Sequence, residues 1–126
     1  MEPAEPLAPP SGPIPPTESV TASRSGSSQA ELAARLNEQG RAAITAGDFD
    51  RAASKFREAV ARVPEPKYFF NLCIALFQRG SYDEALTACN AVAPSGAIEP
   101  LLGKADDMIA RIRYEAHRQN VPVKTP

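Results

Sequence analysis

Few side chains of this 126-residue chain could do chemistry, and its two cysteines come first. Cys73 and Cys89 lie eight residues on either side of Ser81, so an antiparallel helical hairpin that turns there would bring them to similar height. They are a candidate redox pair. Helices, however, usually pack about 8–10 Å apart, whereas a disulfide needs Cα atoms within about 7 Å. We therefore expect two buried thiols that behave as small hydrophobic side chains.

The other polar residues form no catalytic or metal-binding pattern. His117 is the single histidine, and it is expected to be solvated near the end of a helix. Asp106 and Asp107 are adjacent, and neighbours on a helix point about 100° apart, so they cannot share one proton. The sequence has no glycine-rich phosphate-binding loop. It therefore predicts a protein that is not an enzyme and that has no cofactor and no metal.

Periodic apolar residues predict two helices in the first half of the chain. The first is expected to begin at a capping box, in which Ser28 and Glu31 satisfy each other's backbone amides, and to continue to Ala46. The second is expected to be capped by Asp48 or Asp50. It should end at a pair of prolines, because the residue before a proline avoids the helical conformation.

Three more helices are expected after these prolines. The third runs from about Lys67 to Arg79 and is unusually apolar. A second capping box, at residues 81–84, opens the fourth, whose apolar residues continue to Val92. The last runs from Ala97 to about Gln119 with an apolar stripe of i, i+3, i+4 spacing, and it tolerates a proline in its first turn. The sequence thus predicts an all-α fold of five helices joined as antiparallel hairpins.

A repeat sets the architecture of these helices. Gly-Asp-Phe-Asp-Arg-Ala at 47–52 recurs as Gly-Ser-Tyr-Asp-Glu-Ala at 80–85, and self-similarity at this period indicates stacked helical hairpins. The chain resembles the tetratricopeptide repeat family. The first unit matches the family's pattern at Leu36, Gly40, Gly47, Phe49, Ala52, Phe56, Ala59 and Pro64, and the second at Phe69, Leu72, Gly80, Tyr82 and Ala85. The second unit departs by placing Cys73 at a small position, Cys89 at an aromatic position and Val92 at an alanine position.

The resemblance implies a short right-handed solenoid with a helical domain at 29–119. Its parts are expected to be repeat one at 33–65, repeat two at 66–96 and a capping helix at 97–119, because end repeats need caps. The stripe of that helix could instead dock a second copy, since two repeats are fewer than the usual three. Residues 120–126 form a C-terminal tail.

Residues 1–28 are expected to be a disordered tail rich in proline and serine. Seven of the thirteen prolines fall in the first sixteen residues, and the few large apolar side chains are too sparse to offset the entropy of ordering. The tail contains Pro-x-x-Pro spacings, such as Pro6–Pro9, and so serves either as a linker or as a docking motif.

In the resembled family, ligands lie along the first helix of each unit, in a concave groove. By position, the candidates for a partner-binding groove here are Asn37, Arg41, Ile44, Thr45, Lys67, Phe70, Asn71, Ile74, Phe77 and Gln78. Their types suit an apolar or amphipathic segment better than a carboxylate clamp, which needs a third repeat. The last helix could instead fold back and bury part of the apolar set.

The expected function is that of a non-enzymatic adaptor that binds a peptide or helix of another protein. Two alternatives remain: a dedicated chaperone of a secreted or assembling subunit, and a structural dimerisation domain, that is, a homodimer. The net charge of −1 gives no case for nucleic acid, and no apolar run approaches the roughly 20 residues of a membrane span. We expect a cytoplasmic protein, or a periplasmic or membrane-tethered one if an upstream signal or anchor precedes residue 1. The alanine- and arginine-rich composition hints at a bacterial source.

Overall fold

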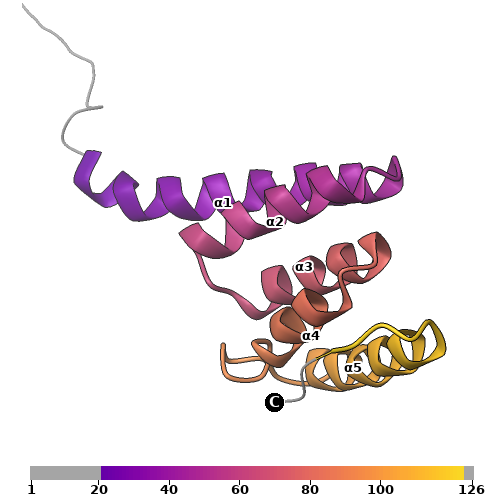
Figure 1. The fold of residues 1–126 in the computed structure, drawn as a ribbon. Coiled ribbons are helices and arrows are strands. Elements are labelled where there is room, and N and C mark those ends of the chain that lie inside the picture. Colours follow the sequence, from indigo (N-terminus) through magenta and orange to yellow (C-terminus); the bar gives the residue numbers. More distant parts are fainter. Residues whose placement is uncertain (1–20, 124–126) are drawn as a thin grey trace, which may run out of the picture. The chain divides into compact units, whose positions relative to one another are not determined.

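The computed structural model describes residues 21–123, with side chains described from Ser28 onward. These residues form five α-helices, which confirms the expected all-α class (Figure 1). The helices are α1 (Thr21–Thr45), α2 (Phe49–Arg62), α3 (Pro66–Arg79), α4 (Tyr82–Asn90) and α5 (Leu101–Arg118). The proline-rich residues 1–20 of the expected tail, with their Pro-x-x-Pro spacings, and residues 124–126 lie outside the described part.

The start of α1 differs from the sequence-based expectation. The helix begins at Thr21, so Ser28 lies inside it and the predicted capping box with Glu31 is wrong. No proline occurs between Thr21 and Ser28, so every residue of this stretch keeps the N–H group that helical hydrogen bonds need. The chain divides into two units between Glu31 and Leu32, and the packing described below lies within the second.

The first hairpin is formed by α1 and α2. Gly47 takes the left-handed conformation with φ of 80° after the end of α1, a conformation that glycine adopts at little cost. Asp48 is the N-cap of α2, as predicted, and its side chain accepts a hydrogen bond from the Arg51 amide at 3.2 Å. Within the hairpin, Gly40 faces the ring of the fully buried Phe56.

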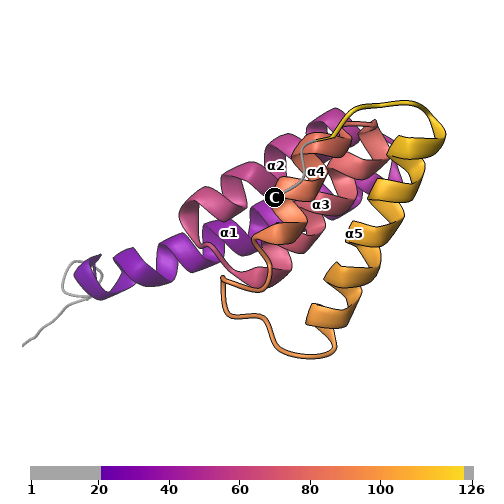
Figure 2. The ribbon, with the colours of Figure 1, turned by 60° about the horizontal axis from the view of Figure 1, so that its bottom comes forward.

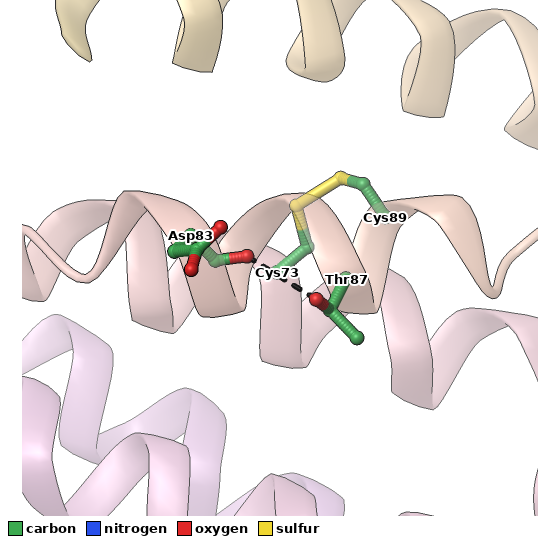
Figure 3. The surroundings of a disulfide bond; sticks show 4 residues. All are labelled: Cys73, Asp83, Thr87 and Cys89. Carbon is green, nitrogen blue, oxygen red and sulfur yellow. Dashed lines mark hydrogen bonds between the residues drawn. A yellow bond between two sulfur atoms is a disulfide. The ribbon is translucent and has the colours of Figure 1, made fainter. Parts of the chain in front are cut away.

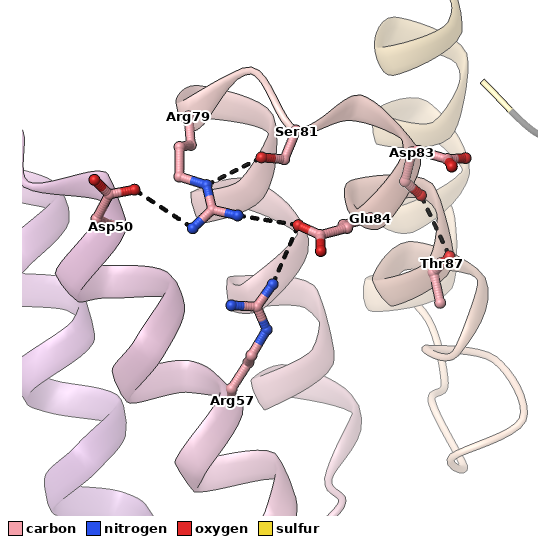
Figure 4. A network of polar contacts seen from close by, with 7 residues as sticks. All are labelled: Asp50, Arg57, Arg79, Ser81, Asp83, Glu84 and Thr87. Carbon is pink, nitrogen blue, oxygen red and sulfur yellow. Dashed lines mark hydrogen bonds and ion pairs between the residues drawn. The ribbon is translucent and has the colours of Figure 1, made fainter. Parts of the chain in front are cut away.

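The second hairpin, α3 and α4, turns at Gly80, which has φ of 90°. The predicted capping box at 81–84 does not form, since Ser81 is the N-cap of α4 but makes no side-chain cap hydrogen bond. Its hydroxyl accepts instead from Nε of Arg79 at 3.0 Å, while Glu84 accepts from Arg79 at 3.0 Å and from Arg57 at 3.2 Å (Figure 4). Charge-assisted bonds to guanidinium groups are stronger than a bond to a backbone amide. Ser81 and Glu84 therefore bind the arginines instead of capping the backbone amides of α4.

The polar network of Figure 4 joins the two hairpins. Arg79 is also within 3.4 Å of Asp50 on α2, and Arg57, which reaches Glu84, lies on α2 as well. The side chain of Arg79 is 29% exposed, so solvent and salt screen its ion pairs less than they screen pairs at the open surface. The network therefore fixes the first turn of α4 against the preceding hairpin.

The last two helices are shorter than predicted. Helix α4 ends at Asn90, although Val92 beyond it is still fully buried. Helix α5 begins at Leu101 rather than Ala97, with Pro100 as its N-cap instead of a residue of the first turn. The Glu99 carboxylate accepts from the Gly103 amide at 3.0 Å, and this bond supplies the missing cap. Ile98, expected on the apolar stripe, consequently stays outside the helix and is 77% exposed.

Helix α5 packs against α3 and α4, which lie between it and the first hairpin in both views (Figures 1 and 2). Ala105, Ile112 and Ala116 of its stripe are buried, and the last two belong to the main core cluster with residues of α2, α3 and α4. Val121 and Val123, expected to be part of a tail, also pack against this cluster. The described chain thus covers the second hairpin with α5 and the residues that follow it.

Tyr68 gives the fold a dependence on alkaline pH. Its side chain is 3% exposed in a cluster with Ala33, Leu36 and Ala59, and burial, followed by the charge of Glu65, raises the pKa of its hydroxyl above the ordinary value. A raised pKa in the folded state favours the neutral phenol, so this stabilisation is complete below the ordinary pKa of about 10 and is lost as the pH rises through the folded value.

We expect the free energy of unfolding to fall above about pH 10, and to fall less in Tyr68→Phe, which has no hydroxyl to ionise. Urea denaturation of both proteins at about pH 9 and about pH 11 measures the difference. All other ionisable groups are common to the two proteins, so their contributions cancel in the comparison. Equal losses in the two proteins would contradict the burial of this phenol.

Candidate functional site

The candidate groove residues of α3 lie on one face of that helix, which we call the binding face. Their spacing of three and four residues places Lys67, Phe70, Asn71, Ile74, Phe77 and Gln78 along one side. Phe70, Ile74 and Phe77 are only partly buried, whereas Lys67 and Gln78 are exposed. A row of large apolar side chains is therefore left accessible between polar ends.

Asn37 and Asn71 are brought into direct contact between α1 and α3. The Asn71 amide nitrogen donates to Oδ1 of Asn37 at 2.7 Å. Asn37 is 8% exposed, so it lies beneath the surface rather than in contact with a partner as expected. The bond uses one of the two side-chain N–H groups of Asn71, and the side-chain carbonyl oxygen of Asn71 can still accept a hydrogen bond. Asn37 thus acts as a positioning residue for Asn71.

The other α1 candidates differ in their exposure. Ile44 is partly buried and packs against the main core cluster, as Phe77 does. Arg41 is exposed and lies 3.4 Å from Glu38, and Thr45 donates to the Arg41 carbonyl at 3.2 Å. The Thr45 hydroxyl is therefore engaged by its own helix. The ion pair of Arg41 is between exposed groups one turn apart, and such pairs contribute less than about 1 kcal/mol.

Lys67 is held in a similar way at the start of α3. Its Nζ lies 3.8 Å from the Glu65 carboxylate and 5.4 Å from the centre of the Tyr68 ring. The lysine side chain is 63% exposed. Exposed cations with weak partners can exchange them for a carboxylate of another molecule at little cost.

Arg111 of α5 is a neighbour of the binding face that the sequence did not predict. Its guanidinium lies 5.4 Å from the centre of the Phe77 ring, and Phe77 also contacts Tyr82 with ring centres 5.7 Å apart. The expected alternative, in which the last helix folds back over the apolar row, thus applies at Phe77. Phe70 and Ile74 stay partly exposed. The only signal in the sequence was that α5 is amphipathic, which does not give its register against α3.

A pocket of about 280 Å³ lies on another side of α3. It is lined by residues of α2, α3 and α4 and by Ala91, which follows α4: Arg57, Phe69, Leu72, Leu76, Glu84, Thr87, Ala88 and Ala91. On a helix of 3.6 residues per turn, residues 69, 72 and 76 are centred about 130° around the axis from residues 70, 74 and 77. The pocket therefore belongs to another surface than the binding face, and the sequence did not point to it.

The repeat pattern and the geometry of the two hairpins agree with one family. The family model described as tetratricopeptide repeat matches residues 37–98. Residues 37–98 are tetratricopeptide repeats. The comparison with curated proteins gave no match, and neither did the comparison with solved structures. Tetratricopeptide repeats generally mediate protein–protein interactions and typically carry no catalysis.

The cysteines of the second tetratricopeptide repeat are joined, contrary to the expectation of two free thiols. Cys73 of α3 and Cys89 of α4 form a disulfide, with Cα atoms 5.3 Å apart, on the side of the hairpin toward α5 (Figure 3). The expectation rested on the usual distance between helices. Here the buried side chains of α3 and α4 include Ala75, Ala85 and Ala88, and such small residues allow helices to approach more closely.

Further features of the described residues bear on metal sites, on membrane spans and on the expectation for His117. Within residues 21–123, no group of three or more His, Cys, Asp or Glu residues could hold a metal ion, and no helix is long and apolar enough to cross a membrane. His117 is exposed in the last turn of α5, where its environment is that of a surface residue.

Proposed function

We propose that the binding face holds a peptide or helix of a partner protein, and that the chain works as an adaptor without enzymatic activity. The observation that carries the proposal is the row of Phe70, Ile74 and Phe77, three large apolar side chains on one helix face that stay partly accessible. Aromatic and aliphatic anchors of this kind supply most of the affinity of protein interfaces.

The polar residues around this row favour an amphipathic partner segment with carboxylates. Arg41, Lys67 and Arg111 lie on three different helices, and the first two have exposed, weak partners of their own chain. A partner carboxylate would replace Glu38 or Glu65 in a charge-assisted bond. Asn71, oriented by Asn37, offers a carbonyl oxygen and an N–H group to a peptide backbone. Apolar burial would thus give affinity and these groups would set the register.

Site-specific photo-cross-linking tests the location of this interaction. A photoreactive amino acid at Gln78, which is exposed at the end of the binding face, should form a cross-link with the partner in the cells that produce the protein. The same amino acid at Thr87, exposed beside the pocket on the other side of α3, is the matched control. Cross-links at Gln78 alone support the proposal, and cross-links at Thr87 alone assign the interaction to the pocket. A chaperone would give one stoichiometric client, and a dimer a cross-link to the same chain.

A further inference from the structure

The disulfide occupies the same two repeat positions as a close packing contact of the first repeat. Gly40 and Phe56 precede Cys73 and Cys89 by 33 residues each, the interval that also separates Gly47 from Gly80. In the first repeat these positions meet directly, because a Cβ atom added to Gly40 would lie 2.5 Å from the Phe56 ring. In the second repeat the same two positions are covalently bonded.

Both pairs are buried at the centre of their hairpins. Phe56 and Cys73 have no exposed surface, and Cys89 is 2% exposed. In the first repeat a whole aromatic ring fills the space between the helices. In the second, two short side chains fill it, and they belong to the same core cluster as Ile112 of α5. Without the bond, the second hairpin would have neither the ring nor the cross-link at this position.

We propose that the Cys73–Cys89 disulfide replaces the Phe56–Gly40 contact as the element that holds the second hairpin closed, so that the stability of this repeat depends on oxidation. Closing a loop of this length removes conformational freedom from the unfolded chain and so favours the folded one. The dependence is a property of the fold and does not rest on the proposed binding function.

The oxidation is a thiol–disulfide exchange with a small-molecule disulfide. The Cys73 or Cys89 thiolate attacks one sulfur of the reagent, forming a mixed disulfide and releasing one reagent thiol. The second protein thiolate then attacks the mixed disulfide at the protein sulfur and releases the other reagent thiol. The two protein thiols lose two electrons and two protons in total, and the reagent disulfide takes them up as two thiols. A compartment that maintains oxidised disulfides would complete the hairpin.

The test uses the full chain refolded with oxidised glutathione and compared with and without a reductant. Alkylation of the unfolded protein followed by mass spectrometry should show no free thiol before reduction and two after it. Reduction should lower the midpoint of thermal unfolding by about 10 °C or more and speed amide exchange in α3 and α4 by about 100-fold. An unchanged midpoint, or two free thiols after oxidation, would overturn the proposal.

Two variants without cysteine separate the bond from the side chains. Cys73→Ala/Cys89→Val keeps the site apolar but cannot form the bond, so its midpoint should match that of the reduced wild type and ignore the reductant. Cys73→Gly/Cys89→Phe installs the pair of the first repeat and should be insensitive to reductant with a midpoint above that of the Ala/Val variant. If the Ala/Val variant has the same midpoint of thermal unfolding as the oxidised wild type, the disulfide is not what holds the hairpin closed.

Discussion

Gly40→Ala is expected to lower the free energy of unfolding by about 2 kcal/mol, although alanine is the better helix former. The added Cβ would lie 2.5 Å from Cε1 and 2.7 Å from Cδ1 and Cζ of Phe56, distances that no packed side chains adopt. Phe56 has no exposed surface and cannot move aside. Overpacking of this kind costs about 1–3 kcal/mol, and the helix propensity of alanine offsets about 1 kcal/mol at most.

A double-mutant cycle shows whether the loss comes from this contact. Phe56→Ala alone should cost about 3–5 kcal/mol because it leaves a cavity. In the Phe56→Ala background, Gly40→Ala should be neutral or stabilising, since no ring remains to meet the methyl group. Urea denaturation with a common m-value measures all four proteins. Additive losses would mean that Gly40 and Phe56 do not touch.

Gly103→Ala is the matched control for this cycle. Gly103 is also a helical glycine, but a Cβ there meets only Oε1 of the exposed Glu99 side chain, at 3.1 Å, which has to give by a few tenths of an ångström and can keep its cap bond to the Gly103 amide. We expect this variant to be unchanged or slightly more stable, because alanine favours the helix. If Gly40→Ala behaved in the same way, the close approach of α1 and α2 would be contradicted.

The parts of the fold that the sequence predicted correctly depend on local signals. The turns after α1 and α3 follow from glycines that take positive φ, and the start of α2 follows from an aspartate beside free amides. Both capping boxes were wrong for reasons outside their own four residues. Arg57 and Arg79 bind Glu84 from other positions of the chain, and a helix without a proline stop continues before Ser28.

For the candidate site too, the sequence predicted what depends on local spacing and missed what depends on packing between helices. Repeat position identified which side chains of α3 share a face, because that face follows from helical spacing alone. Burial of Asn37 and the approach of Arg111 to Phe77 depend on how α1 and α5 pack against α3. The disulfide was missed because a typical distance between helices was applied to a hairpin with many buried alanines. Packing distances of this kind are not encoded in any single segment.

Ile74→Arg is expected to weaken binding of the partner by about 100-fold or more. Ile74 lies between Phe70 and Phe77 on the binding face, so a cation there would have to lose its water against apolar anchors. Because Ile74 is only partly buried, the long arginine side chain can reach solvent in the free protein, and the fold should survive. Thermal unfolding followed by circular dichroism checks this point.

The most direct test of the binding face is calorimetric titration of the cross-linked partner segment into wild type, Ile74→Arg and Thr87→Arg. Thr87→Arg adds the same side chain at the lining of the pocket, away from the binding face, so it controls for charge and for bulk. The proposed function predicts a loss of about 100-fold or more for Ile74→Arg and wild-type affinity for Thr87→Arg. The reverse order, or equal affinities in all three proteins, would show that the partner does not bind at this face.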